Sequence, residues 1–255
     1  MRGLSGRTAV VAGGAGGIGT ATSLRLGQEG ATVVVGDING AAATVVAEQI
    51  VKDGGRAVAR TVDASDEASV AELVDFAVGE YGGLDLLHAN AADLSPEVIG
   101  QDSDAVTIPL EAFDRTMHVN MRGYLLCARH AIPHMLRGGG GALVFTSSAA
   151  AFVGEPERPA YAMAKSAINA LVRHIASHWG KEGIRANAVA PGLVLTAPIR
   201  ESIASEFREY ALRMTRSPRL GTPEDIAAMV AFLGSADAEW VNGQVISVDG
   251  GTLLR

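Results

Sequence analysis

The sequence predicts an α/β fold in which short apolar strands alternate with helices around a parallel sheet. The first observation is at the N-terminus, where an apolar run, a glycine-rich turn, a helical stretch and a second apolar run ending on Asp37 follow one another. The second is that this alternation continues along the chain, with small or polar residues where strands end. The third is size, because 255 residues with 48% hydrophobic content can bury a sizeable core.

The N-terminal unit has the layout of a dinucleotide-binding motif. Buried strands are expected at Thr8–Ala12 and 32–36, and the turn after the first matches both G-x-G-x-x-G and G-x-x-x-G-x-G. Glycines allow a tight turn and let the backbone approach a pyrophosphate, and the following helix N-terminus supplies free N–H groups and a positive dipole end. The expected contacts in this turn are Gly13, Gly16, Gly17, Ile18 and Gly19.

Asp37 predicts which dinucleotide is bound. It lies 18 residues after Gly19, near the distance at which an acidic residue reaches the adenosine ribose. A carboxylate accepts hydrogen bonds from ribose hydroxyls and repels a 2′-phosphate. No arginine or lysine stands in the glycine turn or directly after Asp37, where the residue is Ile38. We therefore expect NAD rather than NADP.

Further apolar runs predict strands at 56–62, 84–88, 142–146, 185–190 and 244–248. Helical patterns cover 41–52, 67–81, 110–132, 161–179 and 223–233. Ligands of parallel sheets bind at the carboxyl ends of the strands, which is where Asp63 and the small residues 89–92 lie. Asp63 is expected to contact the adenine amino group or to cap the next helix. Both roles are compatible, since Ser65 or Asp66 is also suited to the cap.

Two segments are expected to shape a substrate pocket, because loops carry specificity on a common scaffold. Residues 93–110 look irregular, and residues 193–219 are polar and arginine-rich, as in a mobile lid. Asn120 falls inside the expected helix 110–132, where its side chain can compete for backbone hydrogen bonds and kink the helix. A fairly apolar substrate, cyclic or aromatic, is favoured by Phe152, Val153, Leu193 and Ile199.

The stretch 148–165 contains the candidate residues for proton transfer. Ser148 follows the expected strand 142–146, while Tyr161 and Lys165 lie four residues apart on one face of an expected helix. A lysine cation beside a phenol lowers the tyrosine pKa from about 10, so that the tyrosine can exchange a proton with an alcohol or carbonyl. Ser148 can bind the same oxygen. The alternative is an ordinary helix surface pair, because Tyr-x-x-x-Lys is frequent by chance.

The order of these motifs resembles the short-chain dehydrogenase/reductase family over nearly the whole chain. The motifs are, in order, the glycine turn, Asp37, Asn90, Asn120, Ser148, Tyr161, Lys165 and Pro191-Gly192. The separation of 13 positions between Ser148 and Tyr161 also matches that family. The resemblance implies a Rossmann-type, doubly wound, seven-stranded parallel sheet with helices on both faces. It further implies a single domain over residues 1–255, a homotetramer, and hydride transfer between nicotinamide and a carbonyl carbon.

The resemblance also implies a role for each matching residue. Tyr161 would be the general acid/base, Lys165 would bind the nicotinamide ribose and lower the pKa of the tyrosine, and Ser148 would orient the substrate oxygen. Asn120 would hold a water molecule that relays protons past Lys165. The other implied cofactor contacts are Thr196 with the backbone of Val194 at the carboxamide, Asp63 with Ala64 at the adenine, and Ile38, Asn90, Ala91, Pro191 and Gly192.

Three positions depart from the family pattern. Ala12 replaces the usual threonine before the first glycine, and residues 89–92 read Ala-Asn-Ala-Ala in place of Asn-Asn-Ala-Gly. These changes remove structural hydrogen bonds or a flexible residue, and no catalytic group. Gly16 stands where phosphate-preferring relatives often carry a basic residue, which agrees with NAD.

Composition argues against several other classes of protein. The net charge of −7 disfavours nucleic acid or acidic membranes as partners. Cys127 is the single cysteine, which excludes an intrachain disulfide and fits a reducing compartment. The pairs His130/His134 and His174/His178 lack the further ligands of a zinc motif, so no metal is expected. Neither a signal-like segment nor a long apolar run is present, and a cytoplasmic location is expected.

These observations together predict an NAD(H)-dependent oxidoreductase that acts on a secondary alcohol or ketone. An enzymatic alternative is an NADPH-dependent 3-oxoacyl thioester reductase with an acyl carrier protein as partner, against which Asp37 argues. An alternative of another class is an NAD-binding regulatory protein without turnover, against which the complete catalytic set argues.

Overall fold

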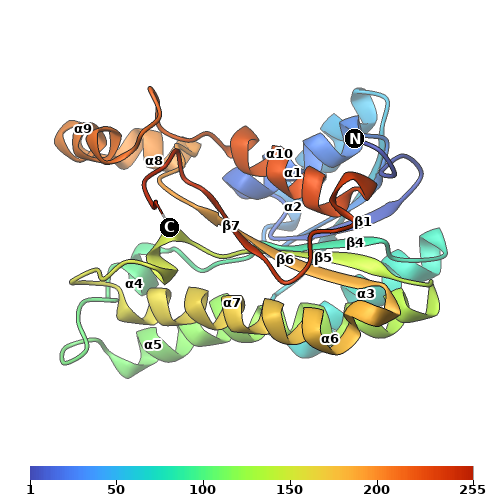
Figure 1. Ribbon diagram of the computed structural model, residues 1–255, viewed down its shortest axis with the longest axis horizontal. Coiled ribbons are helices and arrows are strands. Elements are labelled where there is room, and N and C mark those ends of the chain that lie inside the picture. Colours follow the sequence, from blue (N-terminus) through green and yellow to red (C-terminus); the bar gives the residue numbers. More distant parts are fainter. Residues whose placement is uncertain (255) are drawn as a thin grey trace.

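The computed structural model describes residues 1–254, apart from the side chains at positions 198 and 202. Its centre is a parallel sheet of seven strands in the order β3-β2-β1-β4-β5-β6-β7 (Figure 1). The chain builds outward from β1 to β3, and then returns to the other side of β1 to build β4 to β7. This reversal between β1 and β4 creates the kind of topological switch point at which open α/β sheets bind ligands.

The seven strands are β1 (Thr8–Ala12), β2 (Thr32–Asp37), β3 (Arg56–Thr61), β4 (Leu86–Ala89), β5 (Gly141–Thr146), β6 (Ile184–Pro191) and β7 (Val245–Val248). The helices are α1 (Gly17–Gln28), α2 (Gly40–Lys52), α3 (Glu67–Tyr81), α4 (Pro96–Ile99), α5 (Leu110–Met117), α6 (Gly123–Arg137), α7 (Pro159–Trp179), α8 (Ala197–Ser202), α9 (Ser205–Met214) and α10 (Pro223–Gly234). The predicted doubly wound, seven-stranded parallel sheet is thereby confirmed.

Helices cover both faces of the sheet, which explains why its central strands are mostly apolar. Helices α1, α2 and α10 lie on one face, and α3, α6 and α7 lie on the other (Figure 1). Along β1, Val10 packs into the core below α3, α6 and α7, while Val11 packs into the core below α1, α2 and α10. Side chains of a strand alternate between faces, so a strand buried on both faces needs apolar residues at most of its positions.

The expected helix 110–132 is wrong as a single element. The structure has α5, then a π-helical turn at His118–Arg122, and then α6, which continues to Arg137. Asn120 lies inside the π turn, and its Oδ1 accepts a hydrogen bond of 2.8 Å from the backbone N–H of Asp93. The expectation that Asn120 disturbs the helix is therefore confirmed, and π turns of this kind are frequent at functional sites.

Several boundaries also differ from the sequence-based ranges. The fourth strand begins at Leu86 rather than at residue 84, and the first helix begins inside the glycine turn at Gly17. The segment expected to be irregular contains the short helix α4, and the expected lid contains α8 and α9. These helices lie together at one end of the molecule (Figure 1). Among residues 1–254, no helix combines the length and the hydrophobicity needed to cross a bilayer.

Candidate active site

The glycine turn between β1 and α1 packs closely against the residues that follow β4. Gly13 has a φ angle of +83°, and a Cβ there would lie 2.5 Å from the backbone nitrogen of Ala91. A Cβ on Gly19 would lie 1.9 Å from the carbonyl oxygen of Gly13. Both positions therefore require glycine. At Gly16, in contrast, a Cβ would meet no atom within 4 Å, so this part of the backbone is open to a ligand.

The segment after β6 returns to the glycine turn. Pro191 ends β6, and Gly192 continues along β7 by donating a backbone hydrogen bond of 3.3 Å to Val248. Thr196 then precedes α8, and its N–H donates to the carbonyl of Val194 at 3.0 Å. A Cβ on Gly17 would lie 2.4 Å from Cγ2 of Thr196. The structure thus brings Thr196 against the turn, as a shared ligand would require.

The side chain of Asp37 lies beside the same turn. Its Oδ2 accepts a hydrogen bond of 2.9 Å from the N–H of Ala15, and its Oδ1 accepts one of 3.0 Å from the N–H of Asn39. The neighbouring Ile38 is 64% exposed, and Ile18 is half-buried in the first turn of α1. A carboxylate is therefore fixed at the end of β2, next to the backbone that is open at Gly16.

Asp63 forms a turn of its own and does not cap α3. Its Oδ1 accepts hydrogen bonds from the N–H of Ser65 at 2.8 Å and from the hydroxyl of Ser65 at 2.6 Å. The hydroxyl bond is the main reason why the pKa of Asp63 is lowered. The cap of α3 is Asp66, whose side chain accepts from the N–H of Ala68 at 3.2 Å. Asp63 and the buried Ala64 stand at the end of β3.

Ser148, Tyr161 and Lys165 come together beyond the end of β5. Tyr161 is half-buried, and burial raises its pKa, while a side-chain hydrogen bond with Ser148 lowers it by less. The Nζ atom of Lys165 lies 5.7 Å from the centre of the Tyr161 ring. Lys165 is 1% exposed, and desolvation lowers its pKa to about 7. Without a ligand, burial therefore disfavours the charged form of both groups, the phenolate of Tyr161 and the ammonium of Lys165.

A chain of hydrogen bonds connects Lys165 to the glycine turn. Lys165 Nζ donates to the carbonyl of Thr146 at 2.8 Å, and Thr146 Oγ1 donates to Oδ1 of Asn90 at 2.9 Å. Asn90 Nδ2 in turn donates to the carbonyl of Gly13 at 2.9 Å. His88 Nε2 lies 2.9 Å from Thr146 Oγ1, and burial lowers the pKa of this histidine to about 3. The ends of β4 and β5 thus fix the turn relative to the lysine.

Asn120 presents a buried amide toward this region. Its Oδ1 is occupied by the N–H of Asp93, whose carboxylate is held by Arg115 at 2.8 Å. Its Nδ2 is buried and has no hydrogen-bond partner among the described residues. A buried donor without a partner is costly, so a position for a bound water molecule or ligand group is indicated. This agrees with the water-holding role expected for Asn120.

Asp102 and Tyr124 belong to the site, although the sequence did not single them out. Asp102 is 3% exposed, and its carboxylate accepts hydrogen bonds from the N–H groups of Ala160 at 3.0 Å and Tyr161 at 2.8 Å. It thus caps α7 from a distant loop, which no local pattern reveals. Tyr124 follows Asn120 by four positions, the spacing of one helical face, and this could have marked it.

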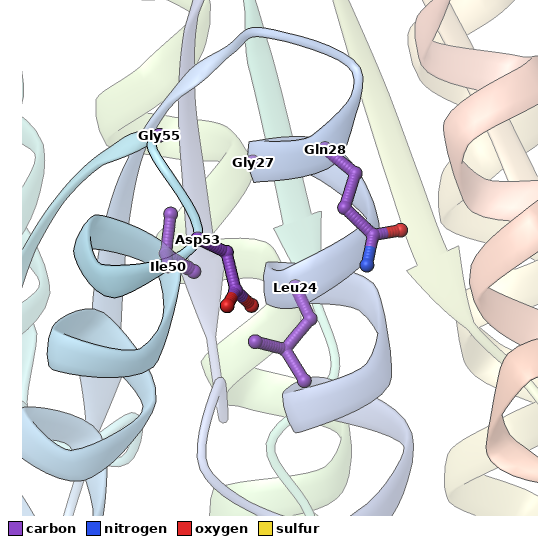
Figure 2. Close-up of a pocket in the computed structure, with 6 residues that line it drawn as sticks. All are labelled: Leu24, Gly27, Gln28, Ile50, Asp53 and Gly55. Carbon is purple, nitrogen blue, oxygen red and sulfur yellow. The ribbon is translucent and has the colours of Figure 1, made fainter.

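Two hollows in the surface lie away from these residues. Figure 2 shows the smaller, a cavity of about 20 Å³ between α1 and α2 that is lined by residues including Leu24, Ile50 and Asp53. The larger has about 400 Å³ and includes Gln28 and Arg56 in its lining. Both lie where α1 and α2 end, before β2 and β3 begin, so they are at the amino edge of the sheet. The candidate active site is at the opposite, carboxyl edge.

Comparisons with known proteins match almost the whole chain. A family model described as enoyl-(acyl carrier protein) reductase matches residues 13–252. A probable short-chain type dehydrogenase/reductase of Bradyrhizobium diazoefficiens is 42% identical over 252 residues, which are 98% of this chain and 88% of the relative. The cis-4-hydroxycyclohexanecarboxylate dehydrogenase of Sinomonas cyclohexanicum is 39% identical over 247 residues, which are 96% of this chain and 96% of the relative.

A solved structure is similar over almost the whole chain. It is a 7α-hydroxysteroid dehydrogenase complexed with NADH and 7-oxo glycochenodeoxycholic acid. It superposes with a TM-score of 0.91 at 35% identity, and the match covers 97% of this chain and 94% of that one.

Proposed function

The chain belongs to the short-chain dehydrogenase/reductase family of oxidoreductases, which act on CH–OH groups, and from this premise we propose that it interconverts a cyclic secondary alcohol and its ketone with NAD(H). The observation that carries the proposal is the cluster of Ser148, Tyr161 and Lys165, tied by hydrogen bonds through Thr146 and Asn90 to the glycine turn. Residues for proton transfer and residues for dinucleotide binding are therefore held at a fixed distance.

The open backbone at Gly16 and the unpartnered amide of Asn120 fit a bound cofactor and its water. We assign the pyrophosphate to the glycine turn, the adenosine ribose to Asp37 and the nicotinamide ribose to Lys165. The remaining assigned contacts are Ile38, Asp63, Ala64, Asn90, Ala91, Pro191, Gly192, Val194 and Thr196. When bound, the nicotinamide supplies the hydride chemistry.

In this proposal the chain's own residues bind the substrate oxygen and move its proton. Tyr161 takes the proton of the alcohol during oxidation and returns it during reduction. Ser148 holds the same oxygen, since its hydroxyl already contacts Tyr161. The charge of Lys165 favours the phenolate and offsets the rise in pKa that burial causes. Asn120 holds the water through which the proton passes to solvent.

NAD is assigned over NADP because of the charge at the end of β2. The carboxylate of Asp37 accepts two backbone hydrogen bonds, which hold it in place beside the turn. A 2′-phosphate would bring a second negative charge to this carboxylate, and like charges in contact repel. The similar 7α-hydroxysteroid dehydrogenase is complexed with NADH, which supports this choice.

A cyclic, fairly apolar substrate is proposed from two lines of support. Two relatives are named for a hydroxyl group on a saturated ring, in 7α-hydroxysteroids and in cis-4-hydroxycyclohexanecarboxylate. In this chain, Phe152 and Val153 follow the strand that leads to Ser148, and both are partly exposed. The segment 193–219, with α8 and α9, is assigned as the lid over this substrate. Residues 1–255 are taken as one domain that acts as a cytoplasmic homotetramer, in line with the family.

A second candidate is an NADPH-dependent reductase of 3-oxoacyl thioesters carried by an acyl carrier protein. It is favoured by the description of the matching family model, which names acyl carrier protein. The negative charge of Asp37 argues against it, because NADPH carries the 2′-phosphate.

The test is reduction of NAD⁺ and NADP⁺, run in parallel, with cyclohexanols, hydroxysteroids, linear secondary alcohols and 3-hydroxyacyl thioesters. Turnover of a cyclic alcohol with NAD⁺ is the expected result. Turnover confined to thioesters with NADP⁺ would replace the proposal by the second candidate. If no compound reacts, titration of NADH against the protein decides further, because failure to bind NADH would overturn the assignment of the glycine turn.

A further inference from the structure

The hydroxyl group of Tyr124 has a defined hydrogen-bonding direction. The side chain is 1% exposed in α6, and its ring packs edge-on against Phe145 with a centroid distance of 5.9 Å. The hydroxyl donates to the carbonyl of Thr146 at 3.1 Å. A phenol has one proton, so its lone pairs remain for a donor. Lys165 Nζ is that donor, at 3.1 Å.

The ammonium of Lys165 is buried without a carboxylate. Among the described residues, no ion pair includes Lys165, and its two hydrogen-bond acceptors are the Tyr124 hydroxyl and the Thr146 carbonyl. The titratable groups around it are Tyr161 on its own helix, Tyr124 on α6 and His88 on β4. All three side chains are ordinarily neutral, so none of them supplies a negative charge to pair with the lysine. Two neutral oxygens therefore hold the cation, and one of its three N–H donors is left for a ligand.

We propose that Tyr124 is a positioning residue whose hydroxyl keeps Lys165 charged and aimed at the active site. Cys127, the other titratable group that faces Tyr124, is buried, and burial raises the pKa of its thiol to about 12, so it stays neutral. Burial likewise raises the pKa of Tyr124 well above its ordinary value, so the phenol remains a neutral acceptor. The inference rests on the proposed function only where it concerns turnover, because the lysine titrates whether or not a substrate is known.

The test is a direct titration of Lys165. The sequence has three lysines, Lys52, Lys165 and Lys181, and the other two are exposed, so a protein labelled at lysine Cε and Nζ gives a small set of signals by NMR. Tyr124→Phe removes the oxygen and keeps the ring. The matched control is Tyr81→Phe, because Tyr81 makes a similar edge contact with Phe76 at 6.3 Å, far from the site.

The expected result is a fall of about one to two pKa units for Lys165 in Tyr124→Phe, since a hydrogen bond to a charged group is lost. Tyr81→Phe should leave the Lys165 titration unchanged. Tyr124→Met, which also lacks the oxygen, should reproduce the fall if Tyr124→Phe folds poorly. With a substrate in hand, the alkaline limb of the kcat/KM profile should move to lower pH by the same amount.

A Lys165 titration that is the same in wild-type protein and in folded Tyr124→Phe or Tyr124→Met would overturn the proposal. This outcome is separate from a failure of the proposed function. Absence of turnover in the wild type would leave the lysine titration intact as a measurement of the hydroxyl's effect.

Discussion

Replacing Asp102 by alanine is expected to destabilise the helix that carries Tyr161 and Lys165. The carboxylate reaches the N-terminus of α7 from the loop between β4 and α5, where it accepts from the N–H groups of Ala160 and Tyr161. The N–H of Arg158 also donates to the backbone carbonyl of Asp102, at 2.9 Å. Asp102 therefore supplies the side-chain link between the loop and the first turn of the helix, beside a backbone bond of 3.2 Å from Arg158 to the carbonyl of Ser103.

The size of the effect follows from burial and charge. The first N–H groups of a helix have no partner within it, and each buried donor left without a partner costs about 1–3 kcal/mol. Loss of a negative charge at a helix N-terminus adds up to about 1 kcal/mol, and relief of the desolvation of that charge offsets part of the total. We therefore expect Asp102→Ala to lose about 2–4 kcal/mol of unfolding free energy. Asp102→Asn keeps one acceptor oxygen and should lose about half as much.

Urea unfolding followed by circular dichroism measures this loss. Asp104→Ala is the matched control, because Asp104 lies in the same loop and accepts from the N–H groups of Val106 and Thr107, but at the surface. The control should change stability much less than Asp102→Ala. Equal stabilities of the two alanine variants would refute the view that Asp102 fastens α7 to the loop.

Three further predictions concern the cofactor site and the core. Asp37→Ser should raise the preference for NADPH over NADH at least about tenfold, because it removes the charge that repels a 2′-phosphate. Calorimetric titration with both cofactors measures it, and an unchanged ratio would remove Asp37 from the assignment. Gly19→Ala should lower the melting temperature and abolish NADH binding, since its Cβ would lie 1.9 Å from a carbonyl oxygen. Gly16→Ala should have the melting temperature of the wild type and bind NADH about tenfold more weakly. A clearly lower melting temperature would contradict the absence of neighbouring atoms at Gly16. His88 has its pKa lowered from 6.5 to about 3, so below pH 6.5 the unfolded chain takes up a proton that the folded chain does not. Stability should therefore fall from pH 6.5 toward pH 3 by up to about 1.4 kcal/mol per pH unit. In urea titrations at several pH values, the unfolding free energy of His88→Gln should fall less steeply as the pH decreases. Parallel losses in His88→Gln and the wild type would show that this histidine does not cause the pH dependence.

The sequence was sufficient for the sheet because the relevant signals are local. A strand buried on both faces is mostly apolar, and β1 and β2 show this directly at residues 9–12 and 33–35. The glycine turn is also visible locally, because a Cβ on Gly19 would meet the carbonyl of Gly13 within the turn itself. The close approach of Gly13 to Ala91, in contrast, joins segments that are far apart in the sequence. The spacing of Tyr161 and Lys165 is enough by itself to place both side chains on one face of a helix.

Other features depend on contacts between distant parts of the chain. Asp102 caps a helix 58 and 59 positions further along, so no sequence window contains both partners. Asn120, inside the π turn, is bonded to the N–H of Asp93, which lies 27 positions earlier. The lysine was expected to lower the pKa of Tyr161, but in the structure the pKa is raised, and burial of the tyrosine is the main cause. Burial of a particular side chain is decided by packing, and spacing does not reveal it.

The most direct test of the account is turnover by Tyr161→Phe, measured with NADH binding on the same preparation. The phenyl ring fills the same space without a proton to exchange. We expect turnover of the best cyclic alcohol to fall by at least about a hundredfold, the lower end of what general acid–base catalysis contributes. The dissociation constant for NADH should stay within about threefold of the wild-type value, because the glycine turn and Asp37 are untouched. Turnover at the wild-type rate in the folded variant would contradict the role of Tyr161 as the proton-transferring group.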